Sequence, residues 1–244
     1  FSYDVAFVNK DVGANKTVNF NNISISGGTD AENYNLVTTT GTATADIDKK
    51  GLTITAVASN IDYGETAPTV TVNYSGFAGS EDDSVLDDTG FSLGTDYTSG
   101  DHIGTYNTTI AQGTATDNNY NFATLNTSTF TVGKRDLTLN NFIADNKTYD
   151  GTTDVTGDSF TDDRVDGDNL TFSYDVAFVN KDAGANKTVN FNNISISGGT
   201  DAENYNLVTT TGAATADIDK KDLTVTAVAS NIGYGESAPT VTVN

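Results

Sequence analysis

The string FSYDVAFVNKDAGANKTVNF occupies residues 172–191, and residues 1–20 carry it with a single change, Val12 in place of Ala183. Within it the apolar side chains take every second position from Phe172 to Phe178, with small or polar residues between them. Because successive side chains of a strand point to opposite faces, this alternation predicts a β-strand with one apolar face.

The phase of the alternation changes once after this strand. Apolar residues lie at positions 18 and 20 and then at positions 23 and 25, with Asn21 and Asn22 between them. An extra residue in one strand shifts the following side chains to the other face unless the chain bulges. We interpret the asparagine pair as a bulge or turn that resets the register.

The string belongs to a longer repeat. Residues 1–73 return as residues 172–244 with six small or conservative changes, so the period is 171 residues. A fold that is built once has no reason to carry the same residues twice, and such repeats indicate an array. We expect the parent protein to contain more copies.

A fainter periodicity divides each period into two module types. The junction string KKGLT at residues 49–53 is echoed as KRDLT at 134–138 and KKDLT at 220–224. A Tyr-Gly or Tyr-Asp-Gly turn follows each junction, where glycine supplies the positive φ of a tight turn. These spacings predict one complete module over residues 51–135 and one of the other type over residues 136–221. Residues 1–50 match the C-terminal part of the second type and residues 222–244 the start of the first, and we expect neither fragment to bury a full core alone.

Two signatures allow a resemblance to be named. Residues 147–153 read KTYDGTT, and residues 63–65 read YGE before APTV at 67–70. These modules resemble the YDG and MBG (YGX) repeat families of very large bacterial surface proteins and adhesins, with residues 51–135 of the MBG type and 136–221 of the YDG type. The resemblance implies an extracellular or cell-surface location, and it brings no catalytic residues to this chain.

The expected fold class is mostly β, as tandem small modules in an elongated rod. Seven or so short strands per module suit an immunoglobulin-like sandwich, which we favour for residues 136–221. A short helix is predicted over about residues 80–88, where Ser80 can cap the first turn and Val85 and Leu86 can face a sheet. For residues 51–135 we therefore favour a β-grasp sheet crossed by that helix.

Composition narrows the function classes. Twelve basic and 33 acidic residues give a net charge of −21, which argues against nucleic-acid partners and anionic membrane surfaces. The chain has no cysteine, so it has neither disulfides nor a thiol nucleophile. It has no apolar run long enough to span a membrane as a helix, so no membrane insertion is expected of it.

Calcium is the one ion that the sequence suggests. Residues 162–169, DDRVDGDN, are the densest run of oxygen ligands, with Asp163, Asp166 and Asp168 as the candidate calcium ligands. The run lacks the EF-hand spacing and contains Arg164, so a solvated acidic turn is the alternative. Residues 80–83 and 29–32 are lesser candidates, and no other cofactor is expected.

We expect no enzymatic activity. His102 is the sole histidine, and no nucleophile motif accompanies it. The stretch around it predicts a tight turn into a strand, with Tyr106 anchored back to the backbone as in the tyrosine corner of immunoglobulin-like sandwiches. The turn tyrosines have two interpretations, stacking on sugars or packing in the core, and they are Tyr63, Tyr149 and Tyr234.

Half of the basic residues lie at the module junctions, and they are Lys49, Lys50, Lys134, Arg135, Lys220 and Lys221. One hypothesis is that they pair with carboxylates of the neighbouring module and set the angle between modules. The alternative is that they are ordinary solvated charges, since exposed pairs contribute only about 0 to 1 kcal/mol.

Three functions remain open. The first is a stalk or spacer that extends an adhesive domain from the cell, with neighbouring copies of the repeat as the only partners. The second is a segment of a self-assembling extracellular fibre or sheath, in which copies of the protein pair through exposed strand edges. The third is an adhesin repeat that binds sugar or calcium.

Overall fold

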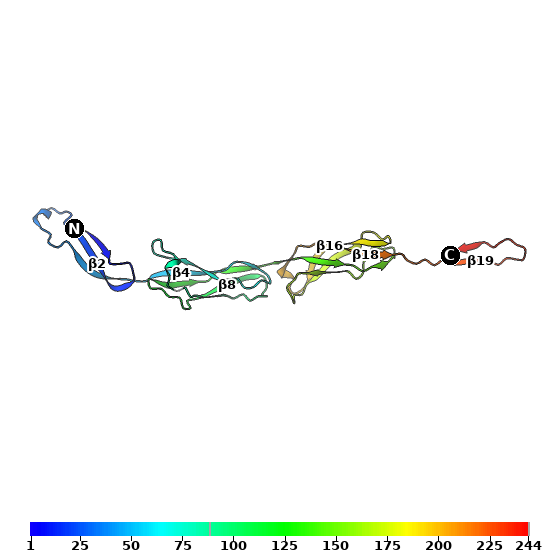
Figure 1. Cartoon of the computed structure of the whole chain (residues 1–244), viewed down its shortest axis with the longest axis horizontal. Helices are drawn as coiled ribbons and strands as arrows, with labels where there is room; N and C mark the ends of the chain where they lie inside the picture. Colours follow the sequence, from blue (N-terminus) through cyan, green and yellow to red (C-terminus); the bar gives the residue numbers. More distant parts are fainter. Residues whose placement is uncertain (88, 244) are drawn as a thin grey trace. The chain divides into compact units, whose positions relative to one another are not determined.

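The structure is a computed structural model that describes residues 1–87 and 89–243. The chain is nearly all β and divides into two compact units, Phe1–Gly133 and Lys134–Asn244 (Figure 1). The mostly-β fold class is therefore confirmed. Among the described residues, no helix is both long and apolar enough to cross a membrane.

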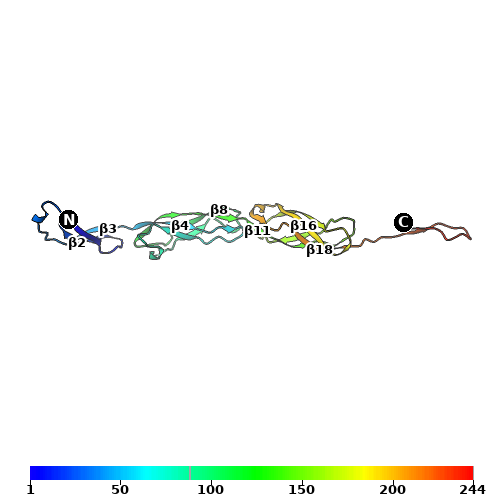
Figure 2. The same ribbon diagram turned by 90° about the horizontal axis from the view of Figure 1, so that it is seen from above.

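The first unit contains three sheets. Its first sheet has the order β1-β2-β3, its second β6-β4-β9 and its third β5-β10-β8-β7. Figure 2 labels β2 and β3 of the first sheet, β4 of the second and β8 of the third. Two 3-10 turns, η1 (Ala31–Asn33) and η2 (Asp83–Val85), complete the unit. The strands are β1 (Ser2–Phe7), β2 (Gly13–Ser24), β3 (Gly41–Ile47), β4 (Lys50–Val57), β5 (Ile61–Asp62), β6 (Thr71–Ser75), β7 (Ser92–Thr95), β8 (Gly104–Ala111), β9 (Tyr120–Asn126) and β10 (Thr129–Gly133).

Strands β4 to β10 form a two-sheet module around an aromatic core. Leu52 and Ile54 of β4 alternate with half-buried residues and are fully buried beside Tyr120 of β9, while Ile110 of β8 packs on them from the other sheet. The hydroxyl of Thr108 in β8 donates to the carbonyl of Ala56 in β4 at 3.0 Å. The core and this buried hydrogen bond join the two sheets.

The second unit contains one complete module and a terminal hairpin. Its larger sheet has the order β13-β18-β16-β15, and β11-β17, β12-β14 and β19-β20 are two-stranded. A 3-10 turn, η3 (Ala202–Asn204), precedes β17. The strands are β11 (Arg135–Leu137), β12 (Leu139–Ile143), β13 (Lys147–Thr148), β14 (Ser159–Asp162), β15 (Thr171–Phe178), β16 (Gly184–Gly198), β17 (Tyr205–Leu207), β18 (Gly212–Asp219), β19 (Ala227–Ala229) and β20 (Val241–Val243).

The two module types share one topology. In the first, β4 pairs antiparallel with β6 and parallel with β9. In the second, β12 pairs antiparallel with β14, and β11 pairs parallel with β17. The larger sheets also correspond, because β5-β10-β8-β7 and β13-β18-β16-β15 have the same directions of pairing. Broken at Thr138, β11 and β12 together take the place of the continuous β4.

The prediction of a short helix over residues 80–88 is wrong in the described part of the segment, and Asp88 lies outside the described residues. Only η2 forms there, one turn of 3-10 helix. Aspartates disfavour helix interiors because their side chains bond nearby backbone groups, and here Asp82 accepts from the backbone N–H of Ser84 at 3.0 Å. The backbone N–H of Asp87 is also drawn away, to the carboxylate of Asp117 at 3.1 Å.

The β-grasp arrangement favoured for residues 51–135 fails with that helix. A grasp sheet needs a helix across its face, and here the sheet β5-β10-β8-β7 supplies the opposing layer. Buried side chains of β4 and β9 therefore pack against the partly buried Ile110 of the other sheet, as in a sandwich.

The predicted register change at Asn21 and Asn22 is confirmed as a bulge inside one continuous strand. The pairing of β1 with β2 shifts between Ser2 and Asp4, and Asn22 has φ of 53°. Asparagine tolerates this left-handed conformation, and its side-chain N–H donates to Asp4 at 2.6 Å. The same bulge recurs in β16 at Asn193, also with φ of 53°.

Candidate functional site

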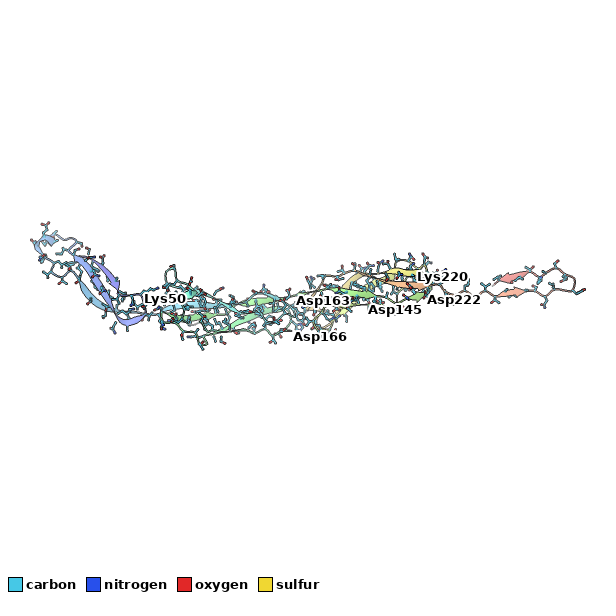
Figure 3. The ribbon with its side chains drawn as sticks, viewed as in Figure 1. Lys50, Asp145, Asp163, Asp166, Lys220 and Asp222 are labelled. Atoms are coloured by element: carbon cyan, nitrogen blue, oxygen red, sulfur yellow. The ribbon has the colours of Figure 1, made fainter. Side chains whose placement is uncertain are left out.

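The acidic loop at residues 162–169 uses carboxylates to bond to neighbouring segments of its module. Asp163 accepts a hydrogen bond from the backbone N–H of Thr138 at 2.7 Å, and Asp168 accepts one from the hydroxyl of Tyr205 at 2.5 Å. Asp163 and Asp166 are both exposed on this unit (Figure 3). Across residues 1–87 and 89–243, no three His, Cys, Asp or Glu side chains gather in a way that could hold a metal ion.

The loop carries its own cation, Arg164. The guanidinium donates to both carboxylate oxygens of Asp162, at 2.7 Å from Nε and 2.5 Å from Nη2. Its Nη1 lies 3.4 Å from the carbonyl oxygens of both Asp168 and Leu170, and its planar head lies over the ring of Phe172. The hydrogen bond from Arg164 lowers the pKa of the Asp162 carboxyl against the opposing effect of burial. The chemistry of the loop is that of an internal ion pair.

The other two acidic clusters also make local structural contacts. Glu81 accepts from the hydroxyl of Tyr120 at 2.5 Å and pairs with Lys10 of the preceding fragment. The hydrogen bond with Lys10 lowers the pKa of Glu81 and raises that of Lys10. Residues 29–32 overlap the start of η1, where the backbone N–H of Ala31 donates to the carbonyl of Gly28 at 3.2 Å.

The YDG signature forms a loop around a lysine, Lys147. Its ammonium donates to the carbonyls of Thr152 at 3.1 Å and Asp154 at 2.9 Å, and it forms an ion pair with Asp150 at 2.9 Å. Asp150 also accepts from the backbone N–H of Thr152 at 2.9 Å, and Gly151 has φ of 87°. The bond from Lys147 is the main cause that lowers the pKa of Asp150 to about 2.

The same loop is tied to the end of the sheet. The backbone N–H of Tyr149 donates to the carbonyl of Asp219 at 2.8 Å, and the N–H of Phe178 donates to the carbonyl of Thr153 at 2.9 Å. Lys147 lies over the ring of Phe178. The YDG motif therefore closes one end of the module. No motif in the sequence assigns a role to Lys147, and its local signal is a single lysine within an aspartate-rich turn.

The YGE signature builds the equivalent turn in the other module type. Gly64 has φ of 83°, and Glu65 accepts from the backbone N–H of Asp62 at 3.0 Å. The N–H of Tyr63 donates to the carbonyl of Gly133 at 2.9 Å, as that of Tyr149 does to Asp219.

The turn tyrosines of the complete modules pack in the core. Tyr63 is buried and Tyr149 packs against the core of its module. Tyr234, in the terminal hairpin, is fully exposed. The core-packing interpretation is therefore confirmed for Tyr63 and Tyr149.

The predicted anchor of Tyr106 is confirmed. Its hydroxyl donates to the carbonyl of His102 at 2.7 Å, four residues upstream. The ring of His102 stacks on Tyr63 with centroids 6.4 Å apart. These contacts give the segment a structural role in the turn before β8.

The basic junction residues bond mainly to backbone or lie in solvent. Lys49 donates to the carbonyl of Asp117 at 2.6 Å and Lys50 to that of Phe77 at 3.2 Å. Lys134 lies 3.9 Å from the exposed Glu203, and Lys220 is exposed (Figure 3). In the first unit the ion pair between fragment and module is instead made by Lys10, a residue outside the junction string.

Two protein families match the chain. The MBG domain (YGX type) matches residues 52–131, and the YDG domain matches residues 133–214. No curated protein and no solved structure matches it. Domains of these two families are typical of the repeat regions of large surface proteins. The chain thus contains an MBG domain of the YGX type followed by a YDG domain, in the tandem order of such repeats.

Proposed function

We propose that this chain is a structural repeat region of a secreted bacterial cell-surface protein, where it acts as a stalk or spacer that extends an adhesive domain. The observation that carries the proposal is the common topology of the two modules within a 171-residue sequence repeat. Because both module types have the same topology, each further 171-residue period would add two more modules of one architecture to the stalk. Neighbouring copies of the repeat are its partners in this role.

The use of polar side chains supports a mechanical role over a chemical one. Arg164 and Lys147 are both partly buried, and they bind carboxylates and carbonyls of the neighbouring loops. The hydroxyls of Tyr106 and Thr108 bond to backbone carbonyls. We therefore propose that the modules have no catalytic activity and no resident cofactor.

Scattering and sedimentation test the stalk. We would compare this chain with versions extended by one and two further 171-residue periods, in calcium and in chelator. The stalk predicts monomers whose maximum dimension rises by a constant amount per period and does not respond to calcium. A dimension that fails to grow with copy number would refute it, and a calcium-dependent change would restore Asp163, Asp166 and Asp168 as an ion site.

A self-assembling fibre is the second candidate, and one specific observation favours it. In the complete modules, strands β7 and β15 lie at the outer edges of the sheets β5-β10-β8-β7 and β13-β18-β16-β15, and β7 exposes Leu93. Open edges and exposed apolar faces are the usual routes to strand pairing between chains. Growth into long particles as the protein concentration rises would favour the fibre over the stalk.

A further inference from the structure

The first and last segments of the MBG domain, residues 50–62 and 120–133, run side by side in parallel. Strand β4 pairs parallel with β9, and β5 pairs parallel with β10. Since β4 leads into β5 and β9 leads into β10, this pair of segments continues from one sheet into the other. The pairing keeps its register apart from one irregularity between Leu52 and Thr53. We call these two segments the terminal pair of the module.

Further hydrogen bonds join the terminal pair outside its ladders. The backbone N–H of Lys50 donates to the carbonyl of Asn119 at 3.0 Å, where the chain enters the module. Between the two ladders, the side-chain oxygen of Asn60 accepts from the backbone N–H of Thr131 at 2.8 Å. The first segment is therefore bonded to the last at its entry, in both sheets and between them.

The YDG domain has a terminal pair of the same design, residues 135–148 and 205–219. Strand β11 pairs parallel with β17, and β13 pairs parallel with β18. Asn146 accepts from the backbone N–H of Asp217 at 2.7 Å, as the equivalent asparagine of the MBG domain does. The parallel terminal pair is thus common to both module types.

This arrangement determines how tension along the chain loads a module. The chain enters at the N-terminal end of one segment and leaves at the C-terminal end of the other, and in a parallel pair these ends lie at opposite ends of the ladder. Tension therefore slides the two segments past each other along their length. The evenly spaced hydrogen bonds of a parallel ladder then share the load and break together. The loaded strands are also inner strands, because β4 lies between β6 and β9 and β10 lies between β5 and β8.

We propose that each complete module is a tension-bearing clamp, in which the terminal pair resists extension of the chain. The clamp rests on the proposed stalk, which would carry any load between the cell and an adhesive domain. A spacer needs only length, so resistance to force is a further property. Forced unfolding is governed by the rate of unfolding, so the clamp is recognised by a force that depends on the pulling direction and not by equilibrium stability.

Single-molecule force spectroscopy on the whole chain tests the clamp in the MBG domain. The chain has no cysteine, so two introduced cysteines are the only attachment points. Asp48→Cys with Lys134→Cys, at exposed positions on either side of the domain's strands, loads the terminal pair lengthwise. Asp48→Cys with the exposed Ser75→Cys instead peels β6 from β4, which pair antiparallel. At one loading rate we expect the lengthwise direction to need at least about twice the force of the peeling direction.

Matched substitutions separate the clamp from general stability. Asn60→Ala removes the bond that bridges the terminal pair, and Asn60→Asp keeps the acceptor oxygen. Asn107→Ala is the control, because it removes a side-chain bond to Asp96 at 2.8 Å outside the terminal pair. Asn60→Ala should lower the lengthwise force and not the peeling force, Asn60→Asp should restore it, and Asn107→Ala should not lower the lengthwise force selectively.

Equal forces in the two directions would overturn the clamp, and so would a lengthwise force that Asn60→Ala leaves unchanged. Thermal unfolding of each variant establishes that its modules are folded before the forces are compared. Scattering tests the stalk separately. A chain whose maximum dimension rises with each period but whose two forces are equal would be a spacer without a clamp.

Discussion

Phe191 and Phe20 are the same residue in two copies of one string, so they allow one substitution to be compared in two environments. Phe191 is fully buried, with ring centroids 5.0 Å from Phe142 and 5.8 Å from Tyr174. Phe20 is half-buried, and its ring contacts Tyr3 at 5.6 Å. We predict that Phe191→Ala severely destabilises its module and that Phe20→Ala leaves that module unchanged.

The magnitude for Phe191→Ala follows from its burial. Replacing a core phenylalanine by alanine costs about 3 to 5 kcal/mol, since transfer energy is lost and a cavity is left. With a urea dependence of about 1.5 kcal/mol per molar for a module of this size, the unfolding midpoint should fall by about 2 to 3 M. Phe20 is only half-buried, so Phe20→Ala should lower the stability of its own sheet by less than about 1.5 kcal/mol.

The assay is urea denaturation read by pulsed hydrogen exchange, so that each module is followed separately. The midpoint of the YDG module is taken from fragments that contain Ala213, and that of the MBG domain from fragments around Leu52. The MBG midpoint should be the same in both variants and serves as the control. A fall of less than about 0.5 M in Phe191→Ala would refute the argument that residues 135–171 and 172–221 share one cooperative core.

Three further predictions concern the loops. Lys147→Met should destabilise the YDG module by about 1 to 3 kcal/mol, because several loop acceptors lose their donor; an unchanged urea midpoint would show that the loop holds without it. The pKa of Asp150 is about 2 in the folded module and normal when unfolded, so its contribution is present above about pH 4 and lost as the pH falls toward 2. The urea midpoint should therefore drop between pH 5 and pH 2.5, and an equal drop in Asp150→Asn would contradict this assignment. Gly199→Ala should destabilise its module by about 1 to 3 kcal/mol more than Gly28→Ala destabilises its own sheet, in thermal or urea unfolding. Both glycines have positive φ, but only at Gly199 would an added Cβ lie 2.1 Å from the carbonyl oxygen of Asn169. Equal effects of the two substitutions would mean that the clash is relieved.

Local patterns predicted the local structure correctly. Alternation placed Phe172, Tyr174 and Phe178 on one face of β15, and the asparagine pair marked the bulge. The YGE turn forms even where it is not packed against a hydrophobic core. In the terminal hairpin Gly235 has φ of 88° and Glu236 accepts from Gly233 at 2.7 Å, as in the complete module. Such a turn depends on the positive φ of its glycine and on a hydrogen bond between residues three apart. Both are determined by residues that are neighbours along the chain.

The candidate site was less predictable because charge density does not show which charges meet. The run at residues 162–169 suggested calcium from its oxygen count, but Arg164 bonds to Asp162 and to the loop carbonyls. The helix predicted over residues 80–88 does not form in its described part, where the backbone N–H of Asp87 bonds to Asp117, thirty residues away. Partners at such distances along the chain are not encoded in any local pattern.

The repeated string shows which structural features the local sequence does not determine. Residues 205–207 form β17 because β11 pairs with them, while the identical residues 34–36 form no strand. Strand β16 runs from Gly184 to Gly198, whereas its copy β2 ends at Ser24. Strand alternation, bulges and turns follow from neighbours along the chain, so both copies have them. Burial, strand length and the fourth strand of the sheet require a covering segment, because a backbone edge or an apolar face is satisfied only by another part of the fold.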